Sequence, residues 1–439
     1  MPEKLKILII GAGGGREHAL GWKITQPARN AAHNAAGGSP PVRELFFARG
    51  NAGTAKLGTN LDIKETDAEK LLYFSKAEKM DLVLVVSDDA LAAGVVDEFQ
   101  KAGFRTWGPT KAAAKIEWSK TFSKDFMRRH NLPTAKFETF NNFEKAKEYV
   151  KDQSLPIVIK ANGLALGKGV VICPDQESAY ETLENFMIKK IFGESGSEVV
   201  IEEFMEGPEI SIHVFSDGKN YKMFPVSQDH KKIGEGNTGP NTGGIGAITP
   251  LPFVDEKLFK KIEEDIVAPA IRGLVAEGTP FVGILYPGLM LTKDGPNLLE
   301  FNARFGDPEA EVYMRILESD LLDVIDASID GKLNELEIKW VSATACNIVL
   351  CSLGYPGKYE TGKIISGVTE AEKEKDIVVF YAGTKMDDKG NLVTNGGRVL
   401  GVSAMGETLP DVLKKAYNAI SKITFEGMQY RRDIGKYAK

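Results

Sequence analysis

Residues 6–18 read Lys6-Ile7-Leu8-Ile9-Ile10-Gly11-Ala12-Gly13-Gly14-Gly15-Arg16-Glu17-His18, which is an apolar strand, a glycine cluster and the start of a helix. The helical spacing continues through Arg16–Thr25. Two further β-rich segments, Glu44–Phe47 and Asp81–Val86, lie on either side of a second helical segment at Asp67–Lys79. Strand–helix alternation of this kind predicts a parallel, doubly wound sheet of the α/β class.

The glycine cluster has two interpretations that the sequence leaves open. A dinucleotide site is disfavoured, because Arg16 takes the place of the third glycine and the second strand ends in Ala48-Arg49, without an acid for a ribose. A phosphate could still bind the free N–H groups of the helix start together with Arg16. The alternative is a tight strand–helix turn that needs small residues and binds nothing.

An α+β region is expected after this sheet. One helix is predicted over Ala112–His130, capped by Thr110. The long glycine-rich segment Ser227–Pro250 is predicted to be a functional loop. The other expected elements are strands at Pro156–Lys160, Gly169–Cys173, Glu198–Phe204, Glu209–Ser216 and Tyr221–Val226, helices at Gln176–Phe192, Asp255–Ala276 and Pro410–Ser421, and a hairpin of Phe281–Thr292 with Asn297–Ala303.

A second glycine loop, Lys160-Ala161-Asn162-Gly163-Leu164-Ala165-Leu166-Gly167-Lys168-Gly169, lies between two of these strands. Glycines let the backbone wrap phosphate oxygens, and Lys160 and Lys168 can supply positive charge. The spacing of Gly163 and Gly167 differs from that of a Walker loop. We interpret the loop as a flexible flap over phosphate groups, since a plain hairpin would not need paired lysines.

The sharpest motif is Glu300-Phe301-Asn302-Ala303-Arg304-Phe305-Gly306-Asp307-Pro308-Glu309. On a strand, Glu300 and Asn302 point to one face while Phe301 points into the core. A carboxylate and an amide oxygen suit Mg²⁺, and the Arg304 guanidinium suits phosphoryl oxygens. A solvent-facing polar edge would not explain this alternation.

Weaker signals lie between these motifs. Acids on predicted strands, in Glu202-Glu203-Phe204 and at Glu209, could grip an adenosine, although exposed strand faces are commonly acidic. The segments Gln228–Lys232 and Asn237–Gly244 have the composition of a loop that folds over a ligand. His230 by itself is equally compatible with a ligand contact and with a surface position.

Composition excludes several classes of function. The 439 residues are 43% hydrophobic and 26% charged, with a net charge of −6, so no basic surface for nucleic acid or an anionic membrane is expected. Three cysteines without a paired spacing predict buried thiols. The charged start and short apolar run are unlike a signal peptide or membrane span, and a cytoplasmic location is expected.

Taken in order, these segments resemble the phosphoribosylamine–glycine ligases, a family of ATP-grasp enzymes, through nearly the whole chain. Gly-Gly-Arg-Glu-His and Thr-Gly-Pro-Asn-Thr-Gly-Gly are specific to that family, whereas the flap and the Glu300 motif are shared more loosely by other ATP-grasp ligases. Supporting stretches are residues 14–20, 50–54, 119–120, 124–126, 355–357, 382–384, 394–399 and 432–435.

The resemblance implies a fold and a reaction. It implies a Rossmann-like domain over 1–118, an ATP-grasp domain over 119–340 with a mobile subdomain at about 134–204, and a C-terminal domain over 341–439. The implied reaction joins glycine to phosphoribosylamine with ATP through a glycyl phosphate, in purine synthesis. Mg²⁺ or Mn²⁺ is the implied metal, and a monomer or weak homodimer is expected.

The resemblance also implies roles for individual residues. Arg304 and Lys160 are expected to be catalytic, and Glu300 and Asn302 to bind the metal. ATP is expected to contact Lys120, Lys160, Gly163, Gly167, Lys168, Gly169, Glu202, Glu203, Phe204 and Glu209. The other substrates are expected to contact Gly14, Gly15, Arg16, Glu17, His18, Asn51, Gly53, Thr54, Asp88, Asp229, His230, Lys231, Asn241, Thr242, Gly243, Arg304, Asp307 and Pro308.

Some positions depart from the family pattern. The first loop has one extra residue, and Val86–Leu91 keeps an acid only as Asp88 while losing two prolines and a glycine. Asn162 stands where an Asp is common, and Tyr286–Thr292 lacks the metal-binding acid of many ATP-grasp enzymes. The alternatives are another ATP-grasp ligase of purine metabolism, which would use formate or bicarbonate, a nucleotide-binding scaffold without catalysis, and, more distantly, a nicotinamide oxidoreductase.

Overall fold

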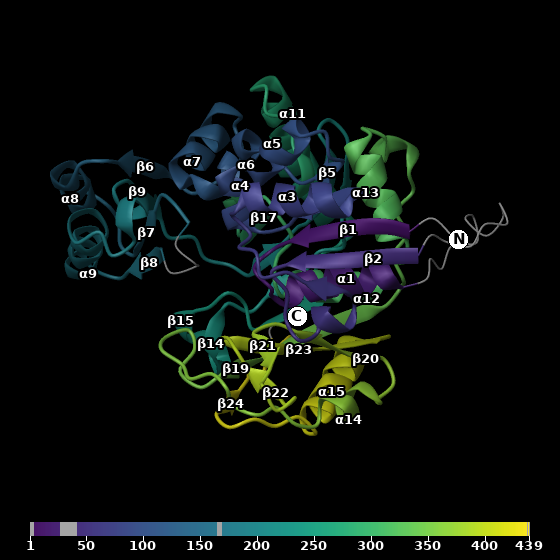
Figure 1. Cartoon of the computed structure of the whole chain (residues 1–439). Helices are drawn as coiled ribbons and strands as arrows, with labels where there is room; N and C mark the ends of the chain where they lie inside the picture. Colours follow the sequence, from purple (N-terminus) through teal and green to yellow (C-terminus); the bar gives the residue numbers. More distant parts are fainter. Residues whose placement is uncertain (1–3, 27–41, 165–168, 437, 439) are drawn as a thin grey trace.

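The computed structural model describes residues 4–26, 42–164, 169–436 and 438. In these residues the strands form four larger sheets and two two-stranded sheets, and helices pack around them (Figure 1). The chain is therefore a mixed α/β multidomain protein, as the sequence predicts.

The N-terminal sheet is parallel, with strand order β3-β2-β1-β4-β5. Its strands are β1 (Lys4–Ile10), β2 (Val42–Ala48), β3 (Thr59–Asn60), β4 (Leu82–Val85) and β5 (Thr106–Trp107). The helices of this region are α1 (Gly15–Thr25), α3 (Ala68–Glu78), α4 (Asp88–Ala93) and α5 (Val95–Lys101). The predicted parallel sheet is confirmed, and β4 is apolar and buried along its whole length, as expected for a strand covered on both faces.

The single helix predicted over Ala112–His130 is wrong, because two helices replace it. They are α6 (Lys111–Trp118), capped by Thr110 as predicted, and α7 (Lys120–Arg129). Ser119 between them is extended, and its hydroxyl accepts from the N–H of Phe122 at 3.4 Å. In the sequence, helical spacing continues through both segments, so the pattern does not reveal the break. The break depends on the contacts that Ser119 makes in the folded chain.

A small antiparallel sheet, ordered β6-β9-β7-β8, forms a unit that projects from the body of the molecule (Figure 1). Its strands are β6 (Phe137–Phe140), β7 (Ile157–Ala161), β8 (Val170–Cys173) and β9 (Val199–Glu203), and its helices are α8 (Phe143–Lys151) and α9 (Gln176–Leu183), which continues as a π-helical turn at Glu184–Ile188. A hydrophobic cluster of its own, including Ile159, Leu183 and Ile201, holds the unit together.

The central sheet contains the predicted hairpin, which is confirmed. Its strands are β10 (Glu209–Ser211), β11 (Val214–Asp217), β12 (Tyr221–Met223), β17 (Val282–Thr292) and β18 (Gly295–Asn302). The strand predicted over Glu209–Ser216 is split at Ile212 and His213. Nearby helices are α10 (Glu256–Ile262), α11 (Ala268–Ala276), α12 (Glu309–Ile316) and α13 (Leu321–Ile329), with a π-helical turn at Glu263–Val267 joining the first two.

The segment Ser227–Pro250 is not the loop that the sequence predicts. It forms β13 (Gln228–Asp229), β14 (Lys232–Gly234), β15 (Thr238–Asn241) and β16 (Gly246–Thr249). The buried strand β16 pairs with β19 (Thr344–Ser352), about a hundred residues later. A strand this short gives little periodicity, and its distant partner supplies the hydrogen bonds, so sequence reasoning missed it.

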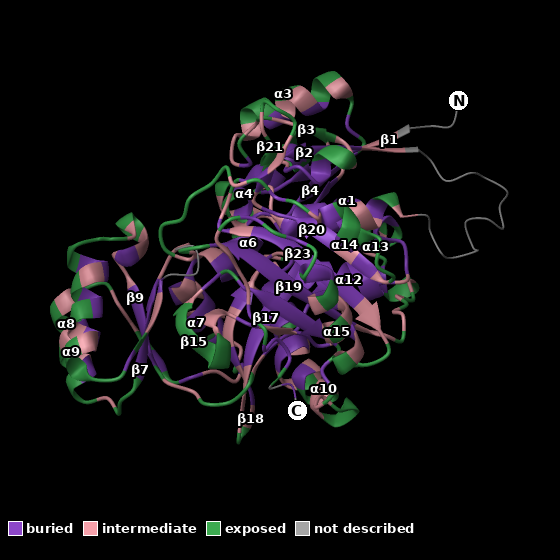
Figure 2. Ribbon diagram, turned by 90° about the horizontal axis from the view of Figure 1, so that it is seen from below, coloured by how far each residue is buried: buried purple, intermediate pink, exposed green. Residues whose placement is uncertain are grey.

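The sheet that contains β16 runs β13-β16-β19-β23-β20, with β24 beside β19. Its later strands are β20 (Ile377–Tyr381), β23 (Arg398–Gly406) and β24 (Met428–Gln429); β21 (Thr384–Met386), β22 (Leu392–Thr394), α14 (Val368–Glu372) and α15 (Leu409–Ile420) lie in the same part of the chain. Figure 2 shows β19 and β23 as largely buried. All three cysteines are free and buried, as predicted.

Candidate active site

Strand β18 presents Glu300 and Asn302 on one face, while Phe301 on the other face is 2% exposed and packs against Phe126. Burial would raise the pKa of Glu300, but Lys231, Lys160 and Lys120 outweigh it and lower that pKa to about 2. The Asn302 amide nitrogen donates to the Tyr286 carbonyl oxygen at 3.4 Å, which leaves the amide oxygen available. This face thus holds an ionised carboxylate beside an amide.

Arg304 lies between two acids from the N-terminal half of the chain. Its guanidinium is 3.0 Å from Glu117 on α6 and 3.7 Å from Asp88 on α4. Burial raises the pKa of Glu117 to about 7, although Arg304 opposes the shift. Burial would also raise the pKa of Asp88, but Arg304 and Arg16 keep it below its ordinary value. Glu117 also accepts the N–H of Ala303 at 2.8 Å, so α6 and the end of β18 are tied together.

Lysines from α7 and β7 converge on the same region. Lys124 and Lys160 both form ion pairs with the buried carboxylate of Glu202, and Lys160 donates to the Leu299 carbonyl at 3.0 Å. Burial lowers the pKa of Lys124 to about 8 and also lowers the pKa of Lys120. Lys120 donates to the Gly163 carbonyl at 3.1 Å, which brings it to the start of the flap.

The structure describes only part of the predicted flap. Gly163 and Gly169 are described, and the Gly169 carbonyl accepts the N–H of Ala161 at 2.8 Å. Gly167 and Lys168 lie outside the described residues.

The acids predicted to surround adenosine lie in different environments. Glu202 is buried between two lysines, whereas Glu203 is exposed and accepts the N–H of Lys136 at 2.9 Å. Phe204 is half-buried. Glu209 forms an ion pair with Lys231, whose ammonium group is also 3.7 Å from Glu300.

The first glycine loop is bonded to carboxylates of the protein itself. The N–H of Gly14 donates to Glu17 at 2.6 Å, and the N–H of Arg16 donates to Asp307 at 3.3 Å. Arg16 is 7% exposed, and its side chain donates to Glu17 and to the Phe305 carbonyl. A side chain at Gly15 would place its Cβ 2.2 Å from Glu311, so α1 approaches α12 closely here.

The residues after this loop join the N-terminal and C-terminal sheets. His18 Nδ1 accepts the N–H of Tyr381 at 2.9 Å, and burial lowers the His18 pKa to about 3. The Asn51 amide donates to the carbonyls of Gly13, Gly14 and Tyr381, and its oxygen accepts from Gly53 and Thr54. In this structure these side chains connect two sheets.

The segment around β13–β16 brings further predicted residues to α12. His230 is buried, not on the surface: Nδ1 donates to the Gly246 carbonyl and Nε2 accepts the N–H of Gly435, both at 3.0 Å. Burial and Glu309 raise the pKa of Asp229 well above its ordinary value. Thr242 donates to the Lys231 carbonyl at 2.7 Å, and Asn241 pairs with Lys232 between β14 and β15.

Arg398 on β23 holds this segment to the Asp307 motif. It donates to the Gly243 carbonyl at 2.7 Å and lies 3.1 Å from the Asp307 carboxylate. Burial would raise the pKa of Asp307, but Arg398 and Arg16 keep it low. Pro308 lies against Gly244, where an added Cβ would come within 2.5 Å of it.

Sequence reasoning missed several groups of this region. Glu117 lies two residues before Ser119-Lys120, and Lys124 lies one turn after it, so their proximity to a predicted ATP contact was the available signal. Glu309 accepts from Tyr286 at 2.7 Å and from Ser211 at 3.0 Å in a buried network. The Glu300–Glu309 motif and the stretch 394–399 contain Glu309 and Arg398, but local pattern assigns neither a role, because their partners come from distant strands.

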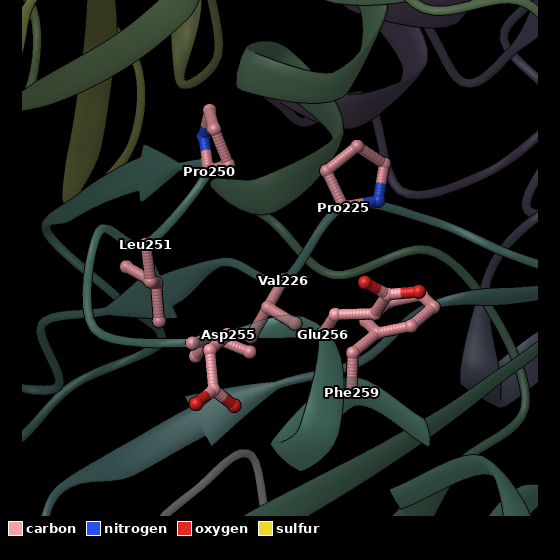
Figure 3. Close-up of a pocket in the computed structure, with 8 residues that line it drawn as sticks. Pro225, Val226, Pro250, Leu251, Asp255, Glu256 and Phe259 are labelled. Carbon is pink, nitrogen blue, oxygen red and sulfur yellow. The ribbon is translucent and has the colours of Figure 1, made fainter.

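An apolar pocket elsewhere contains none of the predicted site residues. Pro225, Pro250, Leu251 and Phe259 are among the residues that line it (Figure 3). The charged region around β18 is therefore the candidate site. Within the described ranges, no three or more His, Cys, Asp or Glu side chains are grouped to hold a metal, and no helix has the length and apolar character to cross a membrane.

Three family models match the chain in succession. Their descriptions are phosphoribosylglycinamide synthetase N domain over residues 5–117, ATP-grasp (A) domain over 118–310, and C domain over 345–437. Together they span most of the sequence.

Curated relatives and solved structures agree with these models. Phosphoribosylamine–glycine ligase of Clostridium acetobutylicum is 45% identical over 432 residues, covering 98% of this chain and 100% of that protein. The crystal structure of phosphoribosylamine–glycine ligase from Thermotoga maritima is 35% identical, with a TM-score of 0.82, and covers 98% and 100% of the two chains. The biotin carboxylase domain of a Hydrogenobacter thermophilus 2-oxoglutarate carboxylase shares the fold, with a TM-score of 0.72 at 14% identity.

Proposed function

The chain belongs to the phosphoribosylglycinamide synthetase family, and from this premise we propose that it joins glycine to phosphoribosylamine in purine biosynthesis. It is an ATP-dependent ligase of the ATP-grasp type, and the products are glycinamide ribonucleotide, ADP and phosphate. The site assignment rests on one observation. Lys120, Lys160 and Lys231 lie close enough to Glu300 to keep its carboxylate ionised. Cations gathered around one acid suit a triphosphate better than a neutral substrate.

The chemistry requires activation of a carboxylate. ATP phosphorylates the glycine carboxylate, which converts a poor leaving oxygen into a good one, and the amine of phosphoribosylamine then attacks the acyl phosphate. No covalent intermediate with the protein is needed, so the protein contributes positioning and electrostatic stabilisation. Arg304 is the proposed group that offsets charge on the transferred phosphoryl, because Glu117 and Asp88 hold its guanidinium beside β18.

ATP is proposed to lie between the flap and β18. Lys120 and Lys160 would contact its phosphates, with the flap residues Gly163, Gly167, Lys168 and Gly169 covering them. Glu202, Glu203, Phe204 and Glu209 are proposed near adenosine. Glu202 is paired with Lys124 and Lys160, so we assign it the further task of orienting those ammonium groups.

Mg²⁺ is the proposed metal, bound by Glu300 and Asn302. Their donor set fits, because a carboxylate that stays ionised and a free amide oxygen are both hard ligands. With two protein ligands, the remaining positions would be filled by water and phosphate oxygens. The metal would supply charge neutralisation on the phosphates.

Glycine and phosphoribosylamine are proposed to bind where α1, α12 and the β13–β16 segment meet. Asp307 and Arg398 are held there by each other, and Asp229 and Glu311 are buried acids with raised pKa values. Burial is the first cause of both shifts. Groups with strongly shifted pKa values cluster at functional sites, which supports this placement.

The deciding experiment is release of ADP by the purified protein, measured with and without glycine and phosphoribosylamine. We expect release that requires both. Turnover with formate or bicarbonate in place of glycine would instead favour another ATP-grasp ligase. ATP binding without turnover for any amine and acid would favour a non-catalytic scaffold.

Three further proposals concern the domain limits, the oligomeric state and the cellular location. The domain limits 1–118, 119–340 and 341–439 are proposed, with β13 and β16 of the second range completing the sheet of the third, and limited proteolysis can test them. A monomer or weak homodimer is proposed, to be measured by sedimentation, and a cytoplasmic location follows from the biosynthetic role.

A further inference from the structure

We propose that Asn162 and Glu198 form a clasp that fixes the start of the flap to α7, and that Asn162 is a positioning residue for Lys120. The clasp joins three segments: the end of β7, the loop before β9 and the first turn of α7. Lys120 opens that helix, and its proposed contact with ATP is the part of this inference that depends on the proposed function.

Asn162 caps α7 from outside the helix. Its backbone carbonyl accepts the N–H of Lys120 at 2.9 Å, and its side-chain oxygen accepts the N–H of Thr121 at 3.0 Å. The first N–H groups of a helix have no partner within the helix, so these two bonds satisfy donors that the break at Ser119 leaves open. The hydroxyl of Ser119 donates to the same side-chain oxygen at 3.1 Å.

The orientation of the Asn162 amide is fixed by its partners. A backbone N–H can only donate, so the atom facing Thr121 must be the amide oxygen. The amide nitrogen then faces Glu198 and donates to its carboxylate at 2.7 Å. The backbone repeats the link, because the N–H of Asn162 donates to the Glu198 carbonyl at 3.0 Å. Both the oxygen and the nitrogen of the Asn162 side chain are therefore used.

The clasp fixes Lys120 at both ends. Its N–H bonds to Asn162, and its ammonium group donates to the carbonyl of Gly163, the next residue along the flap. Gly163 is itself packed closely, since an added Cβ would come within 2.3 Å of the Ser195 hydroxyl. Opening the clasp would therefore separate Lys120 from the flap that it is proposed to meet over ATP.

An aspartate at this position would not be equivalent in this chain. Asn162→Asp keeps the oxygen that caps α7 but replaces the donor with an acceptor, so two carboxylates would face each other. Adding Glu198→Gln restores a donor, because the glutamine amide can donate to the new carboxylate at position 162. The Thr121 hydroxyl, which donates to Glu198 at 2.9 Å, can accept the second N–H of that amide. The requirement is for one donor and one acceptor across this contact.

The test compares N162D, E198Q and the double variant N162D/E198Q with the unaltered full-length protein. We expect N162D to raise the KM for ATP about tenfold, the size of effect that a partly buried polar pair without its hydrogen bond produces, with a smaller change in kcat. The double variant should recover most of the loss. E198Q alone should resemble the unaltered protein, because its amide can turn its oxygen toward Asn162. N142D is the matched control, since Asn142 caps α8 in the same small unit through its oxygen.

A second measurement does not depend on catalysis. Hydrogen exchange at the amides of Lys120 and Thr121 should speed up in N162D without nucleotide and slow again in the double variant. Unchanged exchange and KM in N162D, or a double variant no better than N162D, would overturn the clasp. Failure of the proposed function is distinguishable, because the unaltered protein would then lack glycine-dependent turnover while the exchange pattern remained.

Discussion

At the scale of single residues, the environment of Arg304 supports the role that we propose for it in phosphoryl transfer. Two acids, Glu117 and Asp88, hold the guanidinium. Without the positive charge of Arg304, burying either ionised carboxylate would cost free energy. An arginine fixed in this way needs little reorganisation when charge develops on a substrate. The same contacts make Arg304 part of the stability of the site.

We expect Arg304→Ala to lower kcat about 10²–10³-fold, the usual effect of losing one group that stabilises developing charge. Because the change leaves Glu117 buried without its cation, the variant should also be made together with Glu117→Gln, which removes that charge. Steady-state kinetics on both variants separates catalysis from stability. Arg105→Ala is the control, since Arg105 is half-exposed, lies outside the candidate site and is bonded to Asp326 and Asp330. An unchanged kcat would exclude Arg304 from the mechanism.

Glu117 should make the stability of the protein depend on pH. Its pKa is about 7 in the folded chain, against 4.5 ordinarily, so the folded state binds this proton more tightly than the unfolded state. The stabilisation is complete below about pH 4.5 and is lost as pH rises through about 7, with a cost on the order of 3 kcal/mol.

The measurement is the thermal midpoint of the unaltered protein and of Glu117→Gln at about pH 5.5 and about pH 8. The unaltered protein should lose more stability than the variant over this interval. Equal losses would mean that Glu117 is already ionised at the lower pH.

At the scale of elements, strand β18 sorts its side chains by alternation. Phe301 packs in the core, and this fixes the direction of Glu300 and Asn302 on the opposite face. The pairing with β17 then fixes the position of both polar groups along the strand, because Gly288 pairs with Glu300 and Tyr286 with Asn302. The candidate metal ligands therefore depend on strand register.

Glu300→Ala should raise the Mg²⁺ concentration needed for half-maximal activity at least about tenfold, the lower end of what loss of an outer-shell partner causes. Activity should recover in part at high Mg²⁺ or Mn²⁺, with the thermal midpoint little changed. Glu138→Gln, which alters an exposed acid on β6, should behave like the unaltered protein. A normal Mg²⁺ requirement in Glu300→Ala would remove Glu300 from the metal site.

At the scale of the whole molecule, the N-terminal and C-terminal sheets are joined through polar side chains. Asn51 is 5% exposed and donates to carbonyls of the first glycine loop and of β20. His18 adds a bond to the same strand. The glycine loop is therefore positioned together with a strand that lies more than three hundred places away in the chain.

Asn51→Ala should lower stability by about 2–4 kcal/mol, because it leaves several buried backbone groups without partners. The thermal midpoint should fall clearly, while Asn297→Ala, which removes bonds within one hairpin, should have a small effect. If both variants melted alike, the joint would not depend on Asn51.

Local patterns in the chain were enough to specify the parallel N-terminal sheet, the β17–β18 hairpin, and the faces of β18. These features follow from periodicity, turn residues and caps, which act over a few residues. The family resemblance added the reaction and most of the candidate residues. The roles of all the candidate site residues remain predictions, and Gly167 and Lys168 also lie outside the described residues.

The assembled fold was needed for the break at Ser119, the pairing of β16 with β19, and the partners of Arg304, Lys160 and Arg398. Each of these features depends on polar groups that are far apart in the sequence and become buried next to one another in the fold. The free-energy cost of burying a polar group depends on the hydrogen-bond and ion-pair partners around it. Local pattern carries no information on those partners, so the electrostatics of the site emerge only when the sheets come together.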